Sequence, residues 1–227
     1  MKKVAFALAL TMVLAGTSHA QNTGTVTVNG TVGNAASIRW WSYTPLNTEA
    51  GANAPAVQGS PLSFVLDLGD VAAGNNVNTF AGGTVQLMLR SNNTYTLSAQ
   101  VTAASGFGVA ANGDIVQSDV GFGLANLTNS GALVLGDPAA NSSISPGFAS
   151  DPSGAALDGD GVPTYSATLA DLAGAQPILS GPRISAGGGM GSPNNGLLVD
   201  TIYAVAPQLF TPTGAFSATV TFTMSTP

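Results

Sequence analysis

Strict alternation of apolar and polar residues most limits what this 227-residue chain can fold into. A strand points successive side chains to opposite faces, so a period of two predicts a strand with one buried face. No stretch of twelve residues combines a helical period with capping residues. The sequence therefore predicts an all-β fold. The clearest alternation sets five apolar residues against Ser and Thr near the C-terminus: Phe216, Ala218, Val220, Phe222 and Met224.

Weaker alternation and turn residues predict the remaining elements. Ser91-Asn92-Asn93 separates two alternating segments and predicts a hairpin turn, and Asn112-Gly113 predicts a second hairpin within 109–116. Residues 167–175 predict one short helical turn. The other predicted strands are 62–68, 84–89, 94–101, 120–127, 131–135, 164–170 and 197–205.

The first twenty residues have the layout of a secretory signal peptide. Lys2 and Lys3 precede an apolar run at 4–15, and Ser18-His19-Ala20 supplies the small residues of a cleavage site. We expect a secreted protein that crosses the periplasm, with no membrane span in the mature chain. The predicted organisation is an N-terminal extension at 21–33 and a single β-sandwich domain at 34–227, with long loops at 44–60, 137–163 and 181–196.

Beyond this leader the chain has no histidine, lysine or cysteine. Serine–histidine, serine–lysine and cysteine nucleophiles are thereby excluded, as are the usual zinc ligands. We expect no enzymatic activity, no catalytic residue and no cofactor. Three arginines oppose eleven acidic residues, so nucleic acid is not an expected partner.

Two small clusters are weak candidates for ligand contacts. Asp158 and Asp160 lie in an Asp-Gly-Asp-Gly run whose oxygens suit calcium, although a solvated acidic turn explains them as well. The segment Arg39, Trp40, Trp41 and Tyr43 could stack on a sugar. Adjacent strand residues point to opposite faces, however, so at least one of these tryptophans is expected in the core.

The segment that follows the leader also alternates. Val26, Val28, Gly30 and Val32 share one face, with Thr and Asn on the other. Three interpretations are open: a first strand of the same domain, a hairpin turning at Asn29-Gly30, or a strand donated to a neighbouring copy. Burial of three valines contributes on the order of 5–8 kcal/mol as an upper bound.

Three segments together resemble chaperone–usher pilins, particularly the archaic type, and spore coat protein U-like domains. They are the alternating segment after the leader, Leu-Asp-Leu-Gly-Asp-Val-Ala-Ala-Gly at 66–74, and the alternating ending at 214–224. The chain departs from these families in lacking a disulfide and in the length of 137–196.

This resemblance implies an incomplete immunoglobulin-like sandwich that is finished by the N-terminal extension of the next subunit. Val26, Val28, Gly30 and Val32 would then form the donor strand, and the strand from Phe216 to Met224 would border the acceptor groove. A homopolymer, a periplasmic chaperone and an outer-membrane usher are the implied partners. The expected function is a structural subunit of an exported surface fibre or coat. The alternative is a self-complete secreted β-sandwich that binds a glycan or a surface protein.

Overall fold

The computed structural model describes residues 28–31, 33–46, 51–53, 55, 57–62, 65–69, 71, 80–131, 136–184, 195–206, 212 and 214–227. The chain divides into two units, Met1–Gly33 and Asn34–Pro227, and the strands described below all belong to the second unit. The predicted signal peptide, Val26 and Val32 lie outside the described residues.

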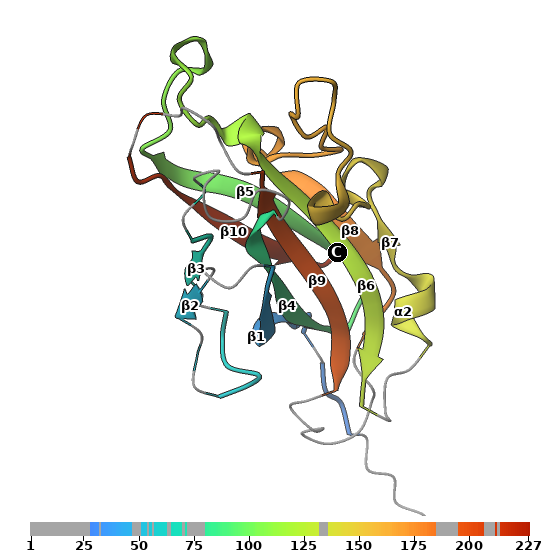
Figure 1. Ribbon diagram of the computed structural model, residues 1–227. Helices are drawn as coiled ribbons and strands as arrows, with labels where there is room; N and C mark the ends of the chain where they lie inside the picture. The colour runs from blue at the N-terminus through green and yellow to red at the C-terminus, as the bar shows by residue number, and fades with distance from the viewer. Residues whose placement is uncertain are drawn as a thin grey trace, which may run out of the picture. The chain divides into compact units, whose positions relative to one another are not determined.

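Two four-stranded antiparallel sheets pack face to face as a sandwich (Figure 1), which confirms the all-β prediction. The first sheet has the order β1 (Ala36–Pro45), β4 (Ala81–Ser91), β9 (Gly196–Val205), β6 (Val120–Ser130). The second has the order β10 (Ser217–Ser225), β5 (Tyr95–Ser105), β8 (Gln176–Gly181), β7 (Ser143–Ile144). A small separate pair joins β2 (Gly51–Asn53) to β3 (Val65–Asp67).

Helical structure in the described part of the chain is limited to short turns. One α-helical turn, α2, spans Pro138–Asn141. Five 3-10 turns accompany it: η1 (Ala110–Asn112), η2 (Gln117–Asp119), η3 (Pro146–Phe148), η4 (Pro152–Gly154) and η5 (Leu169–Leu172). No described helix is long and apolar enough to cross a bilayer.

The inward faces of both sheets form one apolar core. Leu87 on β4 and Leu97 on β5 are fully buried, as are Phe122 on β6 and Leu197 on β9. The alternation detected in the sequence is therefore the alternation between core and solvent, as expected for a sandwich.

The predicted hairpin at Ser91-Asn92-Asn93 is wrong. β4 and β5 do not pair; they belong to different sheets, and the turn between them crosses from one sheet to the other. The Ser91 hydroxyl donates to the Asn93 carbonyl at 2.8 Å and accepts from the Asn93 amide at 3.2 Å, which holds the crossing. Leu87 and Leu97 thus reach the core from different sheets, because alternation specifies the buried face of a strand but not its partner.

Other strand predictions have mixed outcomes. Strands near 120–127 and 197–205 and the short turn within 167–175 are confirmed as β6, β9 and η5. Residues 109–116 form no hairpin strands: η1 occupies 110–112, and Gly113 supplies the positive φ of 77°. Within 164–170 the only strand-like feature is an isolated bridge at Thr168, and among the described residues of 62–68 only β3 is a strand. Of 131–135, only Gly131 is described, and it lies in a bend.

The three predicted loops also carry structure that the sequence analysis missed. β2 lies within 44–60, and α2, β7, η3 and η4 lie within 137–163. Of 181–196, residues 185–194 lie outside the described residues.

The sandwich has two ends, a root end and a distal end. At the root end Ala36 pairs with Ser91 and Ser225 pairs with Thr96. At the distal end Ser105 pairs with Ser217, and Pro45 pairs with Gly83. The Asn34 side chain donates to the Pro227 carbonyl at the root end, so the chain enters the sandwich there.

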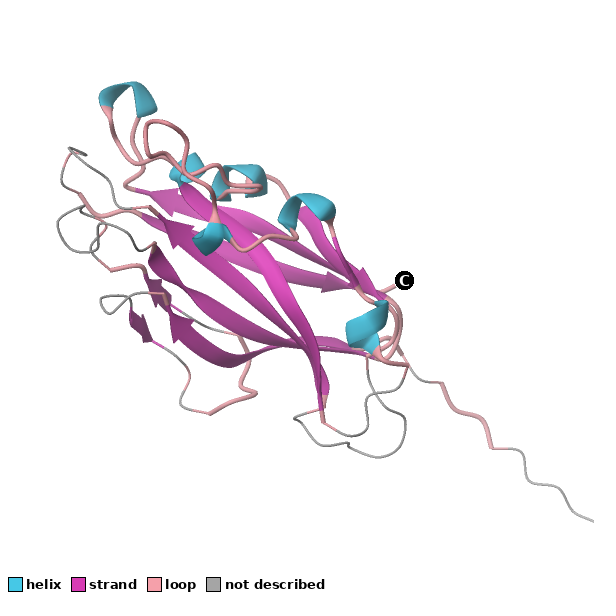
Figure 2. Cartoon of the chain, turned by 45° about the vertical axis from the view of Figure 1, so that its right-hand side comes forward, coloured by secondary structure: helices cyan, strands magenta, loops and turns pink. Residues whose placement is uncertain are grey.

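One long side of the sandwich is closed by the segment from α2 to η5. The Phe122 amide on β6 donates to the Ala167 carbonyl at 3.0 Å, and β7 pairs with the edge of β8. A Cβ at Gly123 would lie 2.0 Å from the Ser150 carbonyl oxygen, so only glycine permits this approach. Figure 2 shows most of the helical turns gathered along this side.

Truncation of the core should cost far more than the same truncation on the surface. Leu97→Ala, at a fully buried position, should lower the free energy of unfolding by about 2–5 kcal/mol, because it removes buried methyl groups and leaves a cavity. Leu157→Ala is the matched control, because Leu157 is 57% exposed, and it should change stability by less than about 0.5 kcal/mol. Urea unfolding of both variants tests this, and equal losses would contradict the assigned core.

Candidate functional site: an open groove between two edge strands

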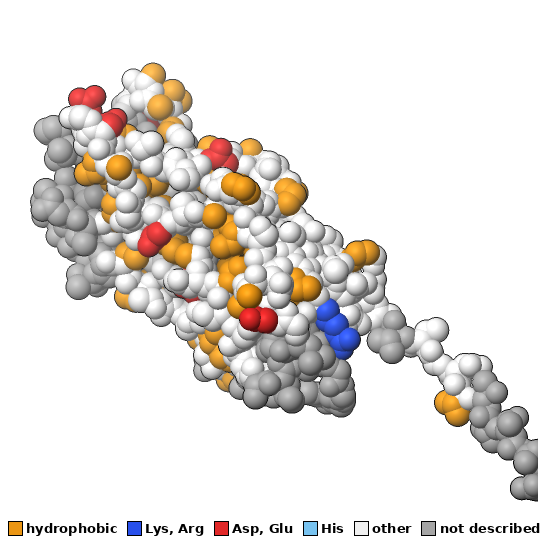
Figure 3. All heavy atoms as spheres, turned by 90° about the vertical axis from the view of Figure 1, so that its right-hand side faces the viewer, with side chains coloured by type: hydrophobic (Ala, Val, Ile, Leu, Met, Phe, Trp, Pro, Cys, Tyr) orange, Lys and Arg blue, Asp and Glu red, His pale blue; other side chains and the backbone are white. Residues whose placement is uncertain are grey.

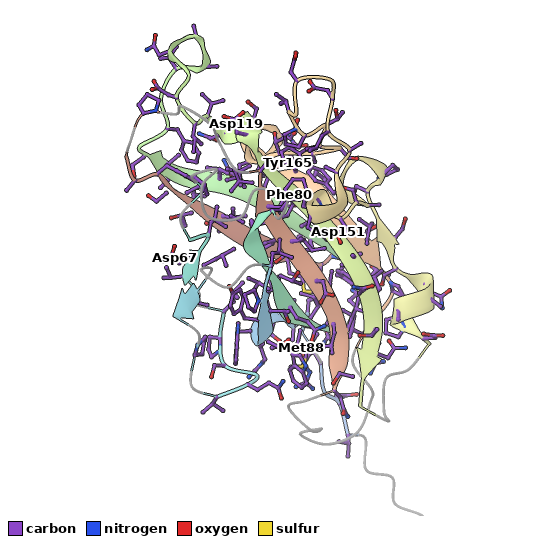
Figure 4. The ribbon with its side chains drawn as sticks, viewed as in Figure 1. Asp67, Phe80, Met88, Asp119, Asp151 and Tyr165 are labelled. Atoms are coloured by element: carbon purple, nitrogen blue, oxygen red, sulfur yellow. The ribbon has the colours of Figure 1, made fainter. Side chains whose placement is uncertain are left out.

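A groove of about 1300 Å³ lies between the two sheets on the long side opposite the covering segment. β1 and β10, the edge strands of the two sheets on this side, contribute to its walls. Its described lining is mostly aliphatic and aromatic, and Asp67 is the one charged residue in it. Figure 4 shows Asp67 on the side of β2 and β3, away from Asp151 on the covered side.

β10 forms one wall of this groove. Phe216, Ala218, Val220 and Phe222 are half-buried and line it, whereas Met224 packs against the core beyond its described lining. The strand pairs with β5 on one side, with a bulge between Thr219 and Val220, and no described strand pairs with its other side. β10 therefore lines this groove, and its role as the border of an acceptor groove stays a prediction.

The outward face of β10 is a polar surface shared with β5. The hydroxyls of Thr102 and Thr221 lie 2.8 Å apart, and those of Ser105 and Ser217 also lie 2.8 Å apart. These cross-strand bonds tie β10 to β5 and leave its apolar face directed at the groove.

The wall opposite β10 consists of β1 and the described residues of 61–71. Ile38 from β1 lines the groove beside Leu62 and Leu66. Part of the β1 edge is already occupied, because the Trp40 amide donates to the Ser60 carbonyl at 3.0 Å and the Gly59 amide donates to the Trp40 carbonyl at 2.9 Å.

A bulge in β1 explains where the four candidate sugar-contacting residues lie. The register with β4 shifts between Trp40 and Ser42, so that Trp40 pairs with Leu87 and Tyr43 with Val85. Both rings therefore pack against the core. The Arg39 guanidinium donates to the Gly59 carbonyl at 2.7 Å. The structure does not bring the four side chains onto one face, and the glycan-binding alternative stays a prediction.

The floor of the groove comes from β4, β6 and β9. Thr201 is buried there, and its hydroxyl donates to the Val85 carbonyl at 2.9 Å. Burial raises the pKa of Tyr203 above its ordinary value of 10.0, and a side-chain hydrogen bond with Thr201 opposes part of that shift. Phe107 packs on Phe216 with ring centroids 5.1 Å apart at the distal end.

The groove closes at the root end and continues to the distal end. Towards the root end its lining stops at Ile38 and Phe222, β1 contacts β10, and Asn34 bonds to Pro227. Towards the distal end the lining continues through Phe107, Phe216 and Gly214. A chain entering lengthwise would therefore enter from the distal end.

The predicted donor residues are only partly described. Val28 and Gly30 lie in non-strand backbone, and the Val28 side chain is 89% exposed. The structure does not choose among the three interpretations of this segment, so its role as a donor strand stays a prediction.

The acidic turn at Asp158 forms local hydrogen bonds. One Asp158 carboxylate oxygen accepts from the Asp160 amide at 2.9 Å and from the Val162 amide at 2.8 Å. Among the described residues, no group of three or more His, Cys, Asp or Glu side chains could hold a metal ion. Calcium at Asp158 and Asp160 remains a sequence-based candidate.

Some lining residues escaped the sequence analysis. Phe107 follows β5 as a single aromatic in a Gly-rich loop, and no periodic signal marks it. Ile38 belongs to β1, whose bulge breaks the period of two. Leu62, Leu66 and Leu68 did carry a signal, because they alternate within a predicted strand, but only the structure places them on the wall of the groove.

Comparison of the chain with protein-family models, with curated proteins and with solved structures finds no match. The groove and the sequence segments that could fill it are therefore the features that bear on function.

Alkaline pH should destabilise the fold partly through Tyr203. Because folding favours the protonated phenol, this contribution is complete below about pH 10 and is lost as the pH rises through the higher pKa of the folded state. Tyr203→Phe should therefore weaken the fall in unfolding free energy between about pH 10 and pH 12. Urea unfolding across that range tests this, and an unchanged slope would contradict the assigned burial.

Proposed function

We propose that the protein is a structural subunit of an exported surface fibre or coat and polymerises by donor-strand exchange. Each copy accepts the N-terminal extension of a neighbour in the groove between β1 and β10. The observation that carries the proposal is the asymmetry of the sandwich: one long side is covered by the chain's own segment, whereas the other holds an apolar groove beside an edge strand.

On the covered side, the chain itself supplies partners for the strand edges. The main chain of β6 hydrogen-bonds to Ala167, and β7 pairs with β8. β10 has no such described partner on its outer edge, although alternate residues of this nine-residue strand direct their amides and carbonyls there. A bound strand would supply those hydrogen bonds and cover the half-buried side chains of β10.

The N-terminal extension has suitable chemistry and length. Residues 23–32 would span about 33 Å as a strand, comparable to the run of β10 from Ser217 to Ser225. Three valines on one face could fill an apolar groove, and Gly30 would fit where the groove is tight. Residues 21–33 have no charged side chain, so insertion of the strand buries no ionised side chain.

The leader and the resemblance to pilins support export of the subunit before it polymerises. An open edge is liable to aggregate, so a periplasmic chaperone that covers it and an outer-membrane usher that assembles the fibre are the proposed partners. Surface fibres need no catalytic residue, in keeping with a mature chain without histidine, lysine or cysteine.

Deletion of residues 21–33 separates this function from an ordinary first strand. The variant should remain folded but lose the ability to polymerise, and a synthetic peptide of residues 23–32 should bind to it. Circular dichroism, sedimentation velocity and peptide fluorescence anisotropy measure the three properties. A variant that is simply unfolded, and is refolded by the peptide without any wild-type polymer, would instead support a strand built into its own domain.

Point substitutions on opposite faces of the donor segment give a finer test. Val28→Asp should abolish polymerisation, because it would bury a carboxylate in the groove, whereas Thr27→Asp on the other face should preserve it. On β10, Val220→Arg should block peptide binding, and Thr223→Arg, at an exposed position outside the described lining of the groove, should not. Equal effects within each pair would contradict insertion between the sheets.

A further inference from the structure

The charges of the sandwich are distributed unevenly between its ends. At the distal end lie the loop 106–116, η2 and η5, and Figure 1 shows the loop 155–163 projecting at the same end. The described residues there include no arginine. Five acidic residues belong to these segments: Asp114, Asp119, Asp158, Asp160 and Asp171.

The root end carries mainly positive charge among its described residues. Arg90 lies one residue before the end of β4, and Arg183 lies two residues beyond the end of β8. Asp137, which caps α2 near the end of β6, is the described acidic residue at this end. On the face shown in Figure 3, basic atoms gather at one end, whereas acidic atoms are spread along the face from near the basic atoms to the other end.

The distal end also exposes aliphatic side chains at its loop tips. Val109 is 58% exposed, Leu157 57% and Val162 54%. Exposed aliphatic residues rimmed by charges of one sign are typical of a surface that contacts another protein.

The direction of the groove indicates which protein would contact the distal end. A donated strand enters from the distal end with its N-terminus leading, because the groove closes at the root end. The body of the donor then stays beside the distal end of the acceptor. Since the extension joins the body at Asn34, the surface facing the acceptor is the donor's own root end.

We propose that the distal end of each subunit docks on the root end of the next copy of the same chain, with Asp160 and its acidic neighbours facing Arg90 and Arg183. This inference rests on the proposed strand exchange and adds a second contact to it. The acidic end attracts the basic end before the strand is inserted, and the aliphatic tips pack against the neighbour afterwards. Like ends repel, so the charges favour head-to-tail order.

Charge reversal at one end, then at both, tests this contact in the full chain. Asp160→Arg or Arg90→Glu should slow polymer growth about tenfold at about 0.02 M salt, and much less at about 0.5 M salt, where screening is strong. The double variant with both changes should recover most of the rate. Gln100→Arg, a charge added in the middle of β5, is the control and should grow like the wild type. Light scattering follows the rate.

Binding of a labelled peptide of residues 23–32 to the full chain separates the two proposals. The peptide has no root end, so its affinity should be the same for the wild type and for all these variants. If the wild type polymerises and Asp160→Arg grows at the wild-type rate at low salt, or the double variant does not recover, the end contact is overturned and strand exchange stands. If the wild type neither polymerises nor binds the peptide, both proposals fail.

Discussion

The unequal closure of the two sides of the sandwich is the constraint on which the rest of the structure depends. Every edge strand presents amides and carbonyls that must find partners in protein or water. The chain provides partners for β6 and β8 from its own segment between α2 and η5. On the opposite side no described strand pairs with the outer edge of β10 beside the groove. A strand from another chain could therefore pair there and complete the sheet.

Stability of the body has to come from packing and from sheet hydrogen bonds. There is no cysteine for a disulfide, and the described residues hold no metal cluster. Leu87, Leu97, Phe122 and Leu197 supply a fully buried centre. The groove lies directly beside this centre, since Val85 and Leu87 contribute to both. An inserted strand would therefore extend the existing core and would not form a separate one.

Periodicity in the sequence predicted which residues face the core but not how the strands pair. Leu87 and Leu97 were both assigned to buried faces, yet the turn between them links two sheets. β1 escaped prediction because the bulge near Trp41 breaks its alternation, and β8 because a proline at 177 interrupts its short apolar run. The covering segment lacked any periodic signal, because isolated contacts such as that of Gly123 with Ser150 hold it. The sequence thus located the β10 wall of the groove but not the closure of the opposite side.

The composition of β10 bears on whether its edge is used. Exposed edges in soluble proteins are commonly protected by a charge, a proline, a β-bulge or a short strand length. β10 has a bulge after Thr219 but none of the others: its nine residues from Ser217 to Ser225 contain neither a charged residue nor proline. β1, on the other side of the groove, contains Arg39 and ends at Pro45. An unprotected edge of this length would promote uncontrolled association unless a specific strand fills it. The absence of protective residues in β10 therefore favours an edge that is meant to be paired, and the bulge after Thr219 leaves most of it regular enough to accept a partner.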